Sequence, residues 1–149
     1  MIALKRNKEY SEFTRVLYLI RGVSGSGKSH LAWKITPCEV SADNYFYDAS
    51  GKYKFMSGKL YEAHKFCQNE TEIYMRMGDY EIAVHNIFAR RWELEPYYKL
   101  AEKLRNVSLG SLIGKYGYKV VEIIIKSNFK NIHGVPAEKV EKQRQRFEF

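Results

Sequence analysis

The feature that most constrains this 149-residue chain is a glycine-rich stretch close to its N-terminus. Residues 22–29 read GVSGSGKS, follow an apolar run from Val16 to Ile20, and precede the mixed segment 30–35. Four residues separate the first glycine from the Gly-Lys-Ser end, which is the full Walker A pattern of a phosphate-binding loop. Such a loop requires a strand before it and a helix after it, and both flanks have these patterns. The sequence therefore predicts binding of a nucleotide phosphate.

Each residue type in this loop has a physical role. Glycine adopts backbone conformations that residues with a Cβ avoid, so that successive N–H groups can point at phosphate oxygens. The helix predicted to begin near Lys28 adds the partial positive charge of its N-terminus. Lys28 is predicted to contact the β- and γ-phosphates of ATP, and the Ser29 hydroxyl to ligate Mg²⁺. A plain strand-to-helix turn is the alternative. The predicted nucleotide-binding residues are Ser24, Gly25, Ser26, Gly27, Lys28, Ser29 and His30.

Strand and helix patterns alternate along the rest of the chain, which predicts an α/β fold with a mostly parallel sheet and helices on both faces. Predicted strands cover residues 16–20, 39–43, 80–84 and 118–125, and predicted helices cover 28–35, 57–77, 91–104 and 136–147. Ser57 is the predicted cap of the second helix. Residues 44–56 are expected to form a hairpin or ordered loop. Polar or Gly- and Ser-rich connections are expected at 5–14, 106–117 and 126–134.

Composition restricts the class of protein. Apolar residues make up 45% and charged residues 28% of the chain, as in soluble globular proteins. No apolar run has the length of a membrane span, and residues 1–14 lack the apolar core of a signal peptide, so a cytoplasmic location and no membrane partner are predicted. Cys38 and Cys67 belong to no paired motif and are expected to be reduced and mostly buried.

The net charge of +8 favours a polyanionic partner, nucleic acid above all, although many basic proteins are simply soluble. Several of the twelve tyrosines lie between lysines, as at 52–54 and 115–119. Interleaved cations and rings can hold a single nucleic-acid strand by charge and stacking. For residues 118–125 an amphipathic strand is the preferred interpretation, whereas for Tyr53 the choice stays open. Arg144 and Arg146 are expected to be solvated helix charges, and the sequence does not indicate an oligomeric state.

Three further segments carry a family resemblance: SADNYFYD at 41–48, GKYKF at 51–55 and KLYEAHKFCQ at 59–68. Together with 92–97 and 133–136 they resemble the AAA_33-type P-loop kinase family, which includes 5′-hydroxyl polynucleotide kinase domains. The resemblance covers nearly all of the chain from Val16 onward. It implies a three-layer P-loop kinase fold with a four- to five-stranded sheet, in a single domain over residues 1–149.

The resemblance also implies an ATP-dependent kinase that transfers the γ-phosphoryl group to a hydroxyl acceptor, most simply the 5′-hydroxyl of a polynucleotide or of a nucleotide-like molecule. Lys28 and Asp43 are then the catalytic residues, with Asp43 as general base in contact with the acceptor. The alternative to a general base is that Asp43 caps a turn or supports the metal indirectly, without a role in proton transfer. Asn86 and Arg90 complete the predicted substrate-binding residues, although Arg90 and Arg91 can equally be a solvated pair at a helix start.

Two segments depart from the family pattern. The third predicted strand ends in His85-Asn86-Ile87-Phe88, where the family has Asp-Asn-Thr-Asn or Asp-Thr-Asn, and an imidazole cannot replace a carboxylate that supports Mg²⁺. His85 can equally be a satisfied core histidine. The lid segment 126–131 is short and contains no arginine, and lysine lacks the planar fork that grips phosphate in two places. A nucleotide-binding protein or ATPase with degenerate or lost transfer activity is therefore the alternative function.

Overall fold

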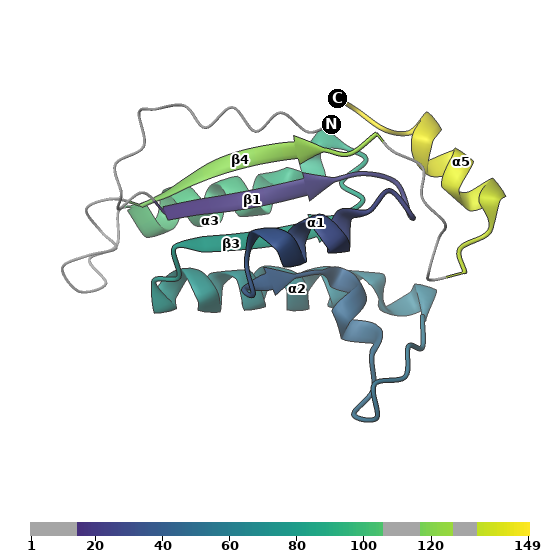
Figure 1. Ribbon diagram of the computed structural model, residues 1–149, viewed down its shortest axis with the longest axis horizontal. Coiled ribbons are helices and arrows are strands. Elements are labelled where there is room, and N and C mark those ends of the chain that lie inside the picture. Colours follow the sequence, from purple (N-terminus) through teal and green to yellow (C-terminus); the bar gives the residue numbers. More distant parts are fainter. Residues whose placement is uncertain (1–14, 106–116, 127–133) are drawn as a thin grey trace.

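The computed structural model describes residues 15–105, 117–126 and 134–149 (Figure 1). Within these residues four strands form one parallel sheet in the order β2-β3-β1-β4. The strands are β1 (Arg15–Arg21), β2 (Glu39–Val40), β3 (Glu81–Asn86) and β4 (Tyr118–Ile124). The predicted α/β fold with a largely parallel sheet is confirmed.

Strand β1 lies inside the sheet because its side chains are apolar on both faces. Leu17 and Leu19 are completely buried in one cluster, and Ile20 is completely buried in the other. Parallel pairing aligns the ends of β1 and β3, so that Ile20 lies opposite His85. The loop after β1 and the end of β3 therefore meet at the same edge of the sheet.

Helices cover both faces and give three layers (Figure 1). Helix α1 (Lys28–Ile35) packs with the smaller cluster, whereas α2 (Leu60–Met77) and α3 (Glu95–Arg105) pack with the larger one. Helix α5 (Ala137–Gln145) lies beyond the arrowheads of the strands in Figure 1, at the carboxyl edge of the sheet. No helix among the described residues has the length and apolar character needed to cross a membrane.

Two local expectations were wrong at their boundaries. Strand β2 ends at Val40, and the chain continues as a 3₁₀ helix (Ala42–Phe46), because the Ser41 hydroxyl caps this turn by accepting the backbone N–H of Asp43. Ser57 does not cap α2: it begins a 3₁₀ turn (Ser57–Lys59), and the residue before α2 makes no side-chain cap. Residues 44–56 contain one antiparallel bridge and are thus an ordered loop.

The cysteine and tyrosine expectations can be compared with the structure. Neither Cys38 nor Cys67 forms a disulfide; Cys67 is buried, which raises its thiol pKa to about 11, and Cys38 is half-buried. Tyr118 is buried in the sheet, as expected for an amphipathic strand. The predicted lead-in at 5–14, nearly all of the connector at 106–117 and most of the lid segment at 126–131 lie outside the described residues.

Candidate functional site

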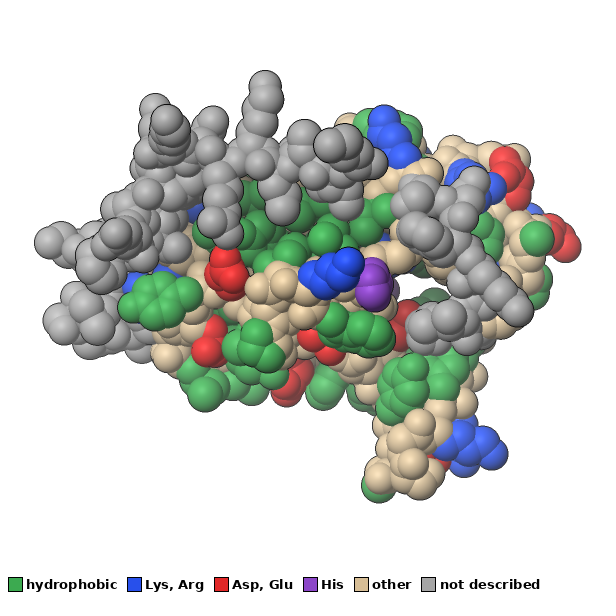
Figure 2. Space-filling view, in the orientation of Figure 1, with side chains coloured by type: hydrophobic (Ala, Val, Ile, Leu, Met, Phe, Trp, Pro, Cys, Tyr) green, Lys and Arg blue, Asp and Glu red, His purple; other side chains and the backbone are tan. Residues whose placement is uncertain are grey.

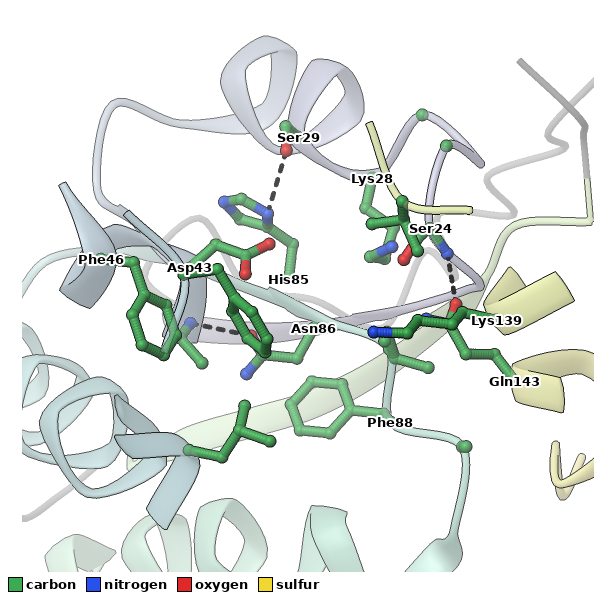
Figure 3. A pocket seen from close by; sticks show the side chains of 18 of the residues that line it. Ser24, Lys28, Ser29, Asp43, Phe46, His85, Asn86, Phe88, Lys139 and Gln143 are labelled. Atoms are coloured by element: carbon green, nitrogen blue, oxygen red, sulfur yellow. Dashed lines mark hydrogen bonds between the residues drawn. The ribbon is translucent and has the colours of Figure 1, made fainter. Parts of the chain in front are cut away.

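A cavity of about 980 Å³ lies at the carboxyl edge of the sheet. Its walls come from the glycine-rich loop and the start of α1, from the turn after β2, from the end of β3, and from α5 (Figure 3). Figure 2 shows a hollow beside a histidine side chain, between the body of the fold and the part that carries α5. Cavities of this size are typical of small-molecule sites.

The glycine-rich loop has a backbone that only glycine tolerates at key positions. Gly25 and Gly27 have φ values of 79° and 95°, and Gly27 is the N-cap of α1. At Gly22 a Cβ would lie 2.4 Å from the Ser26 Oγ and 3.0 Å from the backbone oxygen of Ile125. Ser26 is 1% exposed and does not line the cavity, so it is part of the loop's interior. The other predicted nucleotide-binding residues, Ser24, Gly25, Gly27, Lys28, Ser29 and His30, all line it.

Lys28 lies within this loop, where its ammonium donates a hydrogen bond to the backbone oxygen of Val23 (3.0 Å). Burial lowers the pKa of Lys28 to about 8, and the nearby Asp43 carboxylate opposes this shift. The structure thus brings both predicted catalytic residues into one cavity. A phosphate bound at this point would add a second negative charge beside Lys28 and would favour the charged form of its amine.

Ser29 faces the end of β3. Its Oγ lies 3.4 Å from Nδ1 of His85, whose Nε2 contacts a carboxylate oxygen of Glu39 (Figure 3 shows the Ser29 contact). The hydrogen bond from His85 lowers the pKa of Glu39 against the effect of burial. His85 is 5% exposed and has partners on both ring nitrogens, so it is a satisfied histidine that nevertheless borders the site. The sequence signal for this contact is the place of His85 at the end of a strand that is predicted to lie in the same parallel sheet as the strand before the loop.

Asp43 and Asn86 have different roles in the structure. The Asp43 carboxylate turns into the cavity (Figure 3) and accepts a hydrogen bond from the Tyr53 hydroxyl at 3.3 Å. Asn86 borders the cavity, but its Oδ1 accepts the backbone N–H of Ala42 (2.9 Å) and its amide nitrogen lies 3.5 Å from the Cys67 sulfur. The side chain predicted to bind substrate therefore holds the turn that carries Asp43.

Tyr53 packs inside the ordered loop. Its ring contacts those of Phe46 and Tyr47, with centroids 6.2 and 5.2 Å away, and its hydroxyl reaches Asp43. These contacts favour a ring packed against the fold over an exposed platform for single-strand nucleic acid. Phe46 and Tyr53 thus form an aromatic part of the cavity wall.

Arg90 lies away from the cavity. Its guanidinium is 2.9 Å from the Glu148 carboxylate, and the neighbouring Arg91 pairs with Glu122 at 2.7 Å. Neither arginine lines the cavity, so the structure does not bring Arg90 together with the other predicted substrate-binding residues. Both instead anchor other parts of the chain, with Arg91 also donating its backbone N–H to Glu148.

Helix α5 adds residues that the sequence reasoning missed. The Gln143 side-chain oxygen accepts the backbone N–H of Ser24 at 2.8 Å, directly on the phosphate loop (Figure 3). Lys139 of α5 and Arg146, the residue just after this helix, also line the cavity; Arg146 is exposed, as expected of a solvated charge, but it borders the site. The periodicity of this helix gives no sign of these contacts, because the helix has one buried residue, Val140.

Phe88 closes the cavity beside Asn86 with an unusual backbone. Its φ of 48° is in the left-handed region, and its ring packs edge-on against Tyr97 at 5.5 Å. The fully buried Arg21 donates two hydrogen bonds to the Phe88 carbonyl, at 3.1 and 3.0 Å, and its head lies 4.9 Å from the Phe147 ring. Arg21 therefore connects the phosphate loop, the end of β3 and the C-terminal segment.

The chain is similar in sequence to a human protein. No protein-family model matches this chain. The chain is 33% identical over 147 residues to NEDD4-binding protein 2 of Homo sapiens. The match covers 95% of this chain but spans only 8% of the length of that protein. The activity and partners of the whole relative therefore do not transfer to this chain by similarity.

This finding corrects the function expected from the sequence. The resemblance implied phosphoryl transfer to the 5′-hydroxyl of a polynucleotide, whereas the relative is named for binding NEDD4 and no kinase family model matches. The structure has a physical counterpart to this correction. An imidazole, not a carboxylate, lies beside Ser29, and the Asn86 amide is used inside the fold. The family resemblance and the wider enzyme class stay predictions.

Proposed function

We propose that this chain is a nucleoside triphosphate-binding module, with ATP as its ligand and a divalent cation, Mg²⁺ in the sequence prediction, at Ser29. The observation that carries the proposal is the glycine-rich loop at 22–29, which joins β1 to α1 at the wall of a large cavity. Lys28, Ser29 and the left-handed glycines lie there together. Phosphoryl transfer to an acceptor forms no part of the proposal.

The electrostatics of the loop support an anion. Helix α1 has no acidic residue in its first turn, so that the partial positive charge of its N-terminus is not neutralised by its own side chains. Lys28 adds an ammonium group, which donates a hydrogen bond to the carbonyl of Val23. A phosphate oxygen would replace that carbonyl as the acceptor. Lys139 of α5 and Arg146, the residue just after it, bring two further cations to the same cavity. A triphosphate carries the negative charge that such a set of positive groups favours.

Location and further partners stay predictions. The +8 net charge is the support for a nucleic-acid partner, and the lack of a membrane-crossing helix among the described residues is compatible with the predicted cytoplasmic location. Binding of NEDD4 is indicated by the name of the relative, and we do not propose it for this chain.

Calorimetric titration with ATP tests the proposal. Wild-type protein is expected to bind ATP, and Lys28→Ala to weaken binding about 10- to 100-fold, because a hydrogen bond to a charged group contributes about 1.5–3 kcal/mol. Lys99→Ala is the matched control, since Lys99 is exposed on α3 outside the cavity. Affinity is expected to fall from ATP to ADP to AMP. Equal affinity of wild type and Lys28→Ala, or no binding by wild type, would overturn the proposal.

A further inference from the structure

The contact between Ser29 and His85 raises the question of which cation this site accepts. The Ser29 hydroxyl is the group that the loop pattern assigns to Mg²⁺, and the His85 Nδ1 at the end of β3 lies 3.4 Å from it. Mg²⁺ prefers oxygen ligands in near-ideal octahedral geometry, whereas imidazole suits transition metals such as Co²⁺ and Zn²⁺. The Ser29 hydroxyl suits either kind of cation, whereas the imidazole of His85 favours a transition metal over Mg²⁺ at this point.

The second nitrogen of His85 shows which tautomer faces the loop. Nε2 contacts the Glu39 carboxylate, which can only accept a hydrogen bond when ionised, so Nε2 carries the proton. In the neutral ring Nδ1 then presents its lone pair toward Ser29. A carboxylate on the far nitrogen is the arrangement that metal-ligating histidines have in proteins, because it fixes the tautomer and orientation of the ring.

The spacing of the two ligand atoms agrees with a shared cation. The Ser29 Oγ and the His85 Nδ1, 3.4 Å apart, form a weak hydrogen bond, and at this separation both atoms are also close enough to contact one cation. Among the described residues no group of three or more His, Cys, Asp or Glu side chains could hold a metal by itself. Under the proposed function, phosphate oxygens of the bound nucleotide would complete the coordination.

We propose that Ser29 and His85, with the phosphates of a bound nucleoside triphosphate, form a site that prefers an imidazole-binding transition metal over Mg²⁺. This inference rests on the proposed function. Glu39 acts as a positioning residue, since it touches His85 and not the metal. The Asp43 carboxylate turns into the same part of the cavity (Figure 3) and adds negative charge near the cation.

Titration of the full chain with preformed Co²⁺–ATP and Mg²⁺–ATP tests this site. Wild-type protein is expected to bind Co²⁺–ATP at least about tenfold more tightly, and the visible spectrum of Co²⁺ is expected to shift as nitrogen enters its coordination. His85→Asp replaces the imidazole by a carboxylate and is expected to reverse the preference and remove the spectral shift. Glu39→Gln is expected to reduce Co²⁺–ATP affinity about tenfold, as loss of a partner to a metal-bound histidine does.

The control is Glu72→Gln, which removes a carboxylate paired with Arg76 and Lys103 outside the cavity and is expected to leave the preference unchanged. Circular dichroism establishes that each variant is folded. If His85→Asp does not fold, the wild-type preference and spectrum with Glu39→Gln decide. Equal affinity for both metal complexes with an unshifted spectrum overturns the inference and leaves the proposed function intact. Absence of binding to either complex overturns both.

Discussion

Two walls of one cavity differ in how they use their polar groups. The loop wall, residues 22–29, turns Lys28 and Ser29 toward the cavity. The β3 wall, residues 85–88, directs its polar groups to other parts of the protein: Asn86 to the turn after β2 and to Cys67, and His85 through Nε2 to Glu39. The comparison teaches that the central groups of the phosphate site, Lys28 and Ser29, are encoded within one short stretch of the chain. The β3 wall is held by tertiary contacts, and of its polar side-chain atoms only the Nδ1 of His85 faces the loop.

The largest expected effect concerns the backbone of the loop wall. Gly22→Val places a Cβ where Ser26 Oγ lies 2.4 Å away and the Ile125 backbone oxygen 3.0 Å away, so the loop must shift. Overpacking of this kind costs about 2–3 kcal/mol of the free energy of unfolding. Urea denaturation measures it. Gly58→Ala is the matched control, because no atom lies within 4 Å of its Cβ, and it is expected to change stability by less than about 0.5 kcal/mol.

Replacing Asn86 tests the claim that this residue of the β3 wall supports structure and does not contact ligand. Asn86→Ala leaves the buried N–H of Ala42 without its acceptor, at a cost of about 1–3 kcal/mol of the free energy of unfolding. ATP affinity is expected to change only a few-fold. Asn69→Ala, at an exposed position of α2, is the control for stability. An Asn86→Ala protein with wild-type stability that no longer binds ATP would make Asn86 a ligand contact after all.

The strand, loop and helix of residues 15–35 could be predicted because their signals are contiguous in the chain. The apolar run, the glycine spacing and Lys28 each act on their immediate neighbours. The turn that carries Asp43 was misplaced in part, since capping by Ser41 stops β2 after two residues. The contact of Gln143 with Ser24 joins residues 119 positions apart, and no local pattern encodes it. His85 stands out in the sequence because it occupies the place of the family's aspartate. Its contact with Glu39 forms only because β2 lies beside β3 in the sheet, which no local pattern encodes.

The loop wall is also expected to depend on pH through Lys28. With a pKa of about 8, its ammonium is mostly charged at pH 7 and mostly neutral at pH 9, and a phosphate binds the charged form. ATP affinity, measured without metal in the presence of a chelator, is therefore expected to fall about tenfold between pH 7 and pH 9. Lys28→Arg stays charged over this range and is expected to abolish the dependence. A steep fall that persists in Lys28→Arg would assign it to another group.

The smallest expected effect concerns Gln143, the α5 residue that reaches the loop wall. Its side-chain oxygen accepts the Ser24 N–H, one of the donors that the loop would otherwise offer to phosphate, so the two acceptors compete. Because a neutral hydrogen bond contributes about 0.5–1.5 kcal/mol net, Gln143→Ala is expected to raise ATP affinity about two- to tenfold. Gln145→Ala, exposed on the same helix and outside the cavity, is expected to leave it unchanged. Weaker binding by Gln143→Ala would instead mean that the glutamine contacts the nucleotide, and the loop wall would then extend to α5.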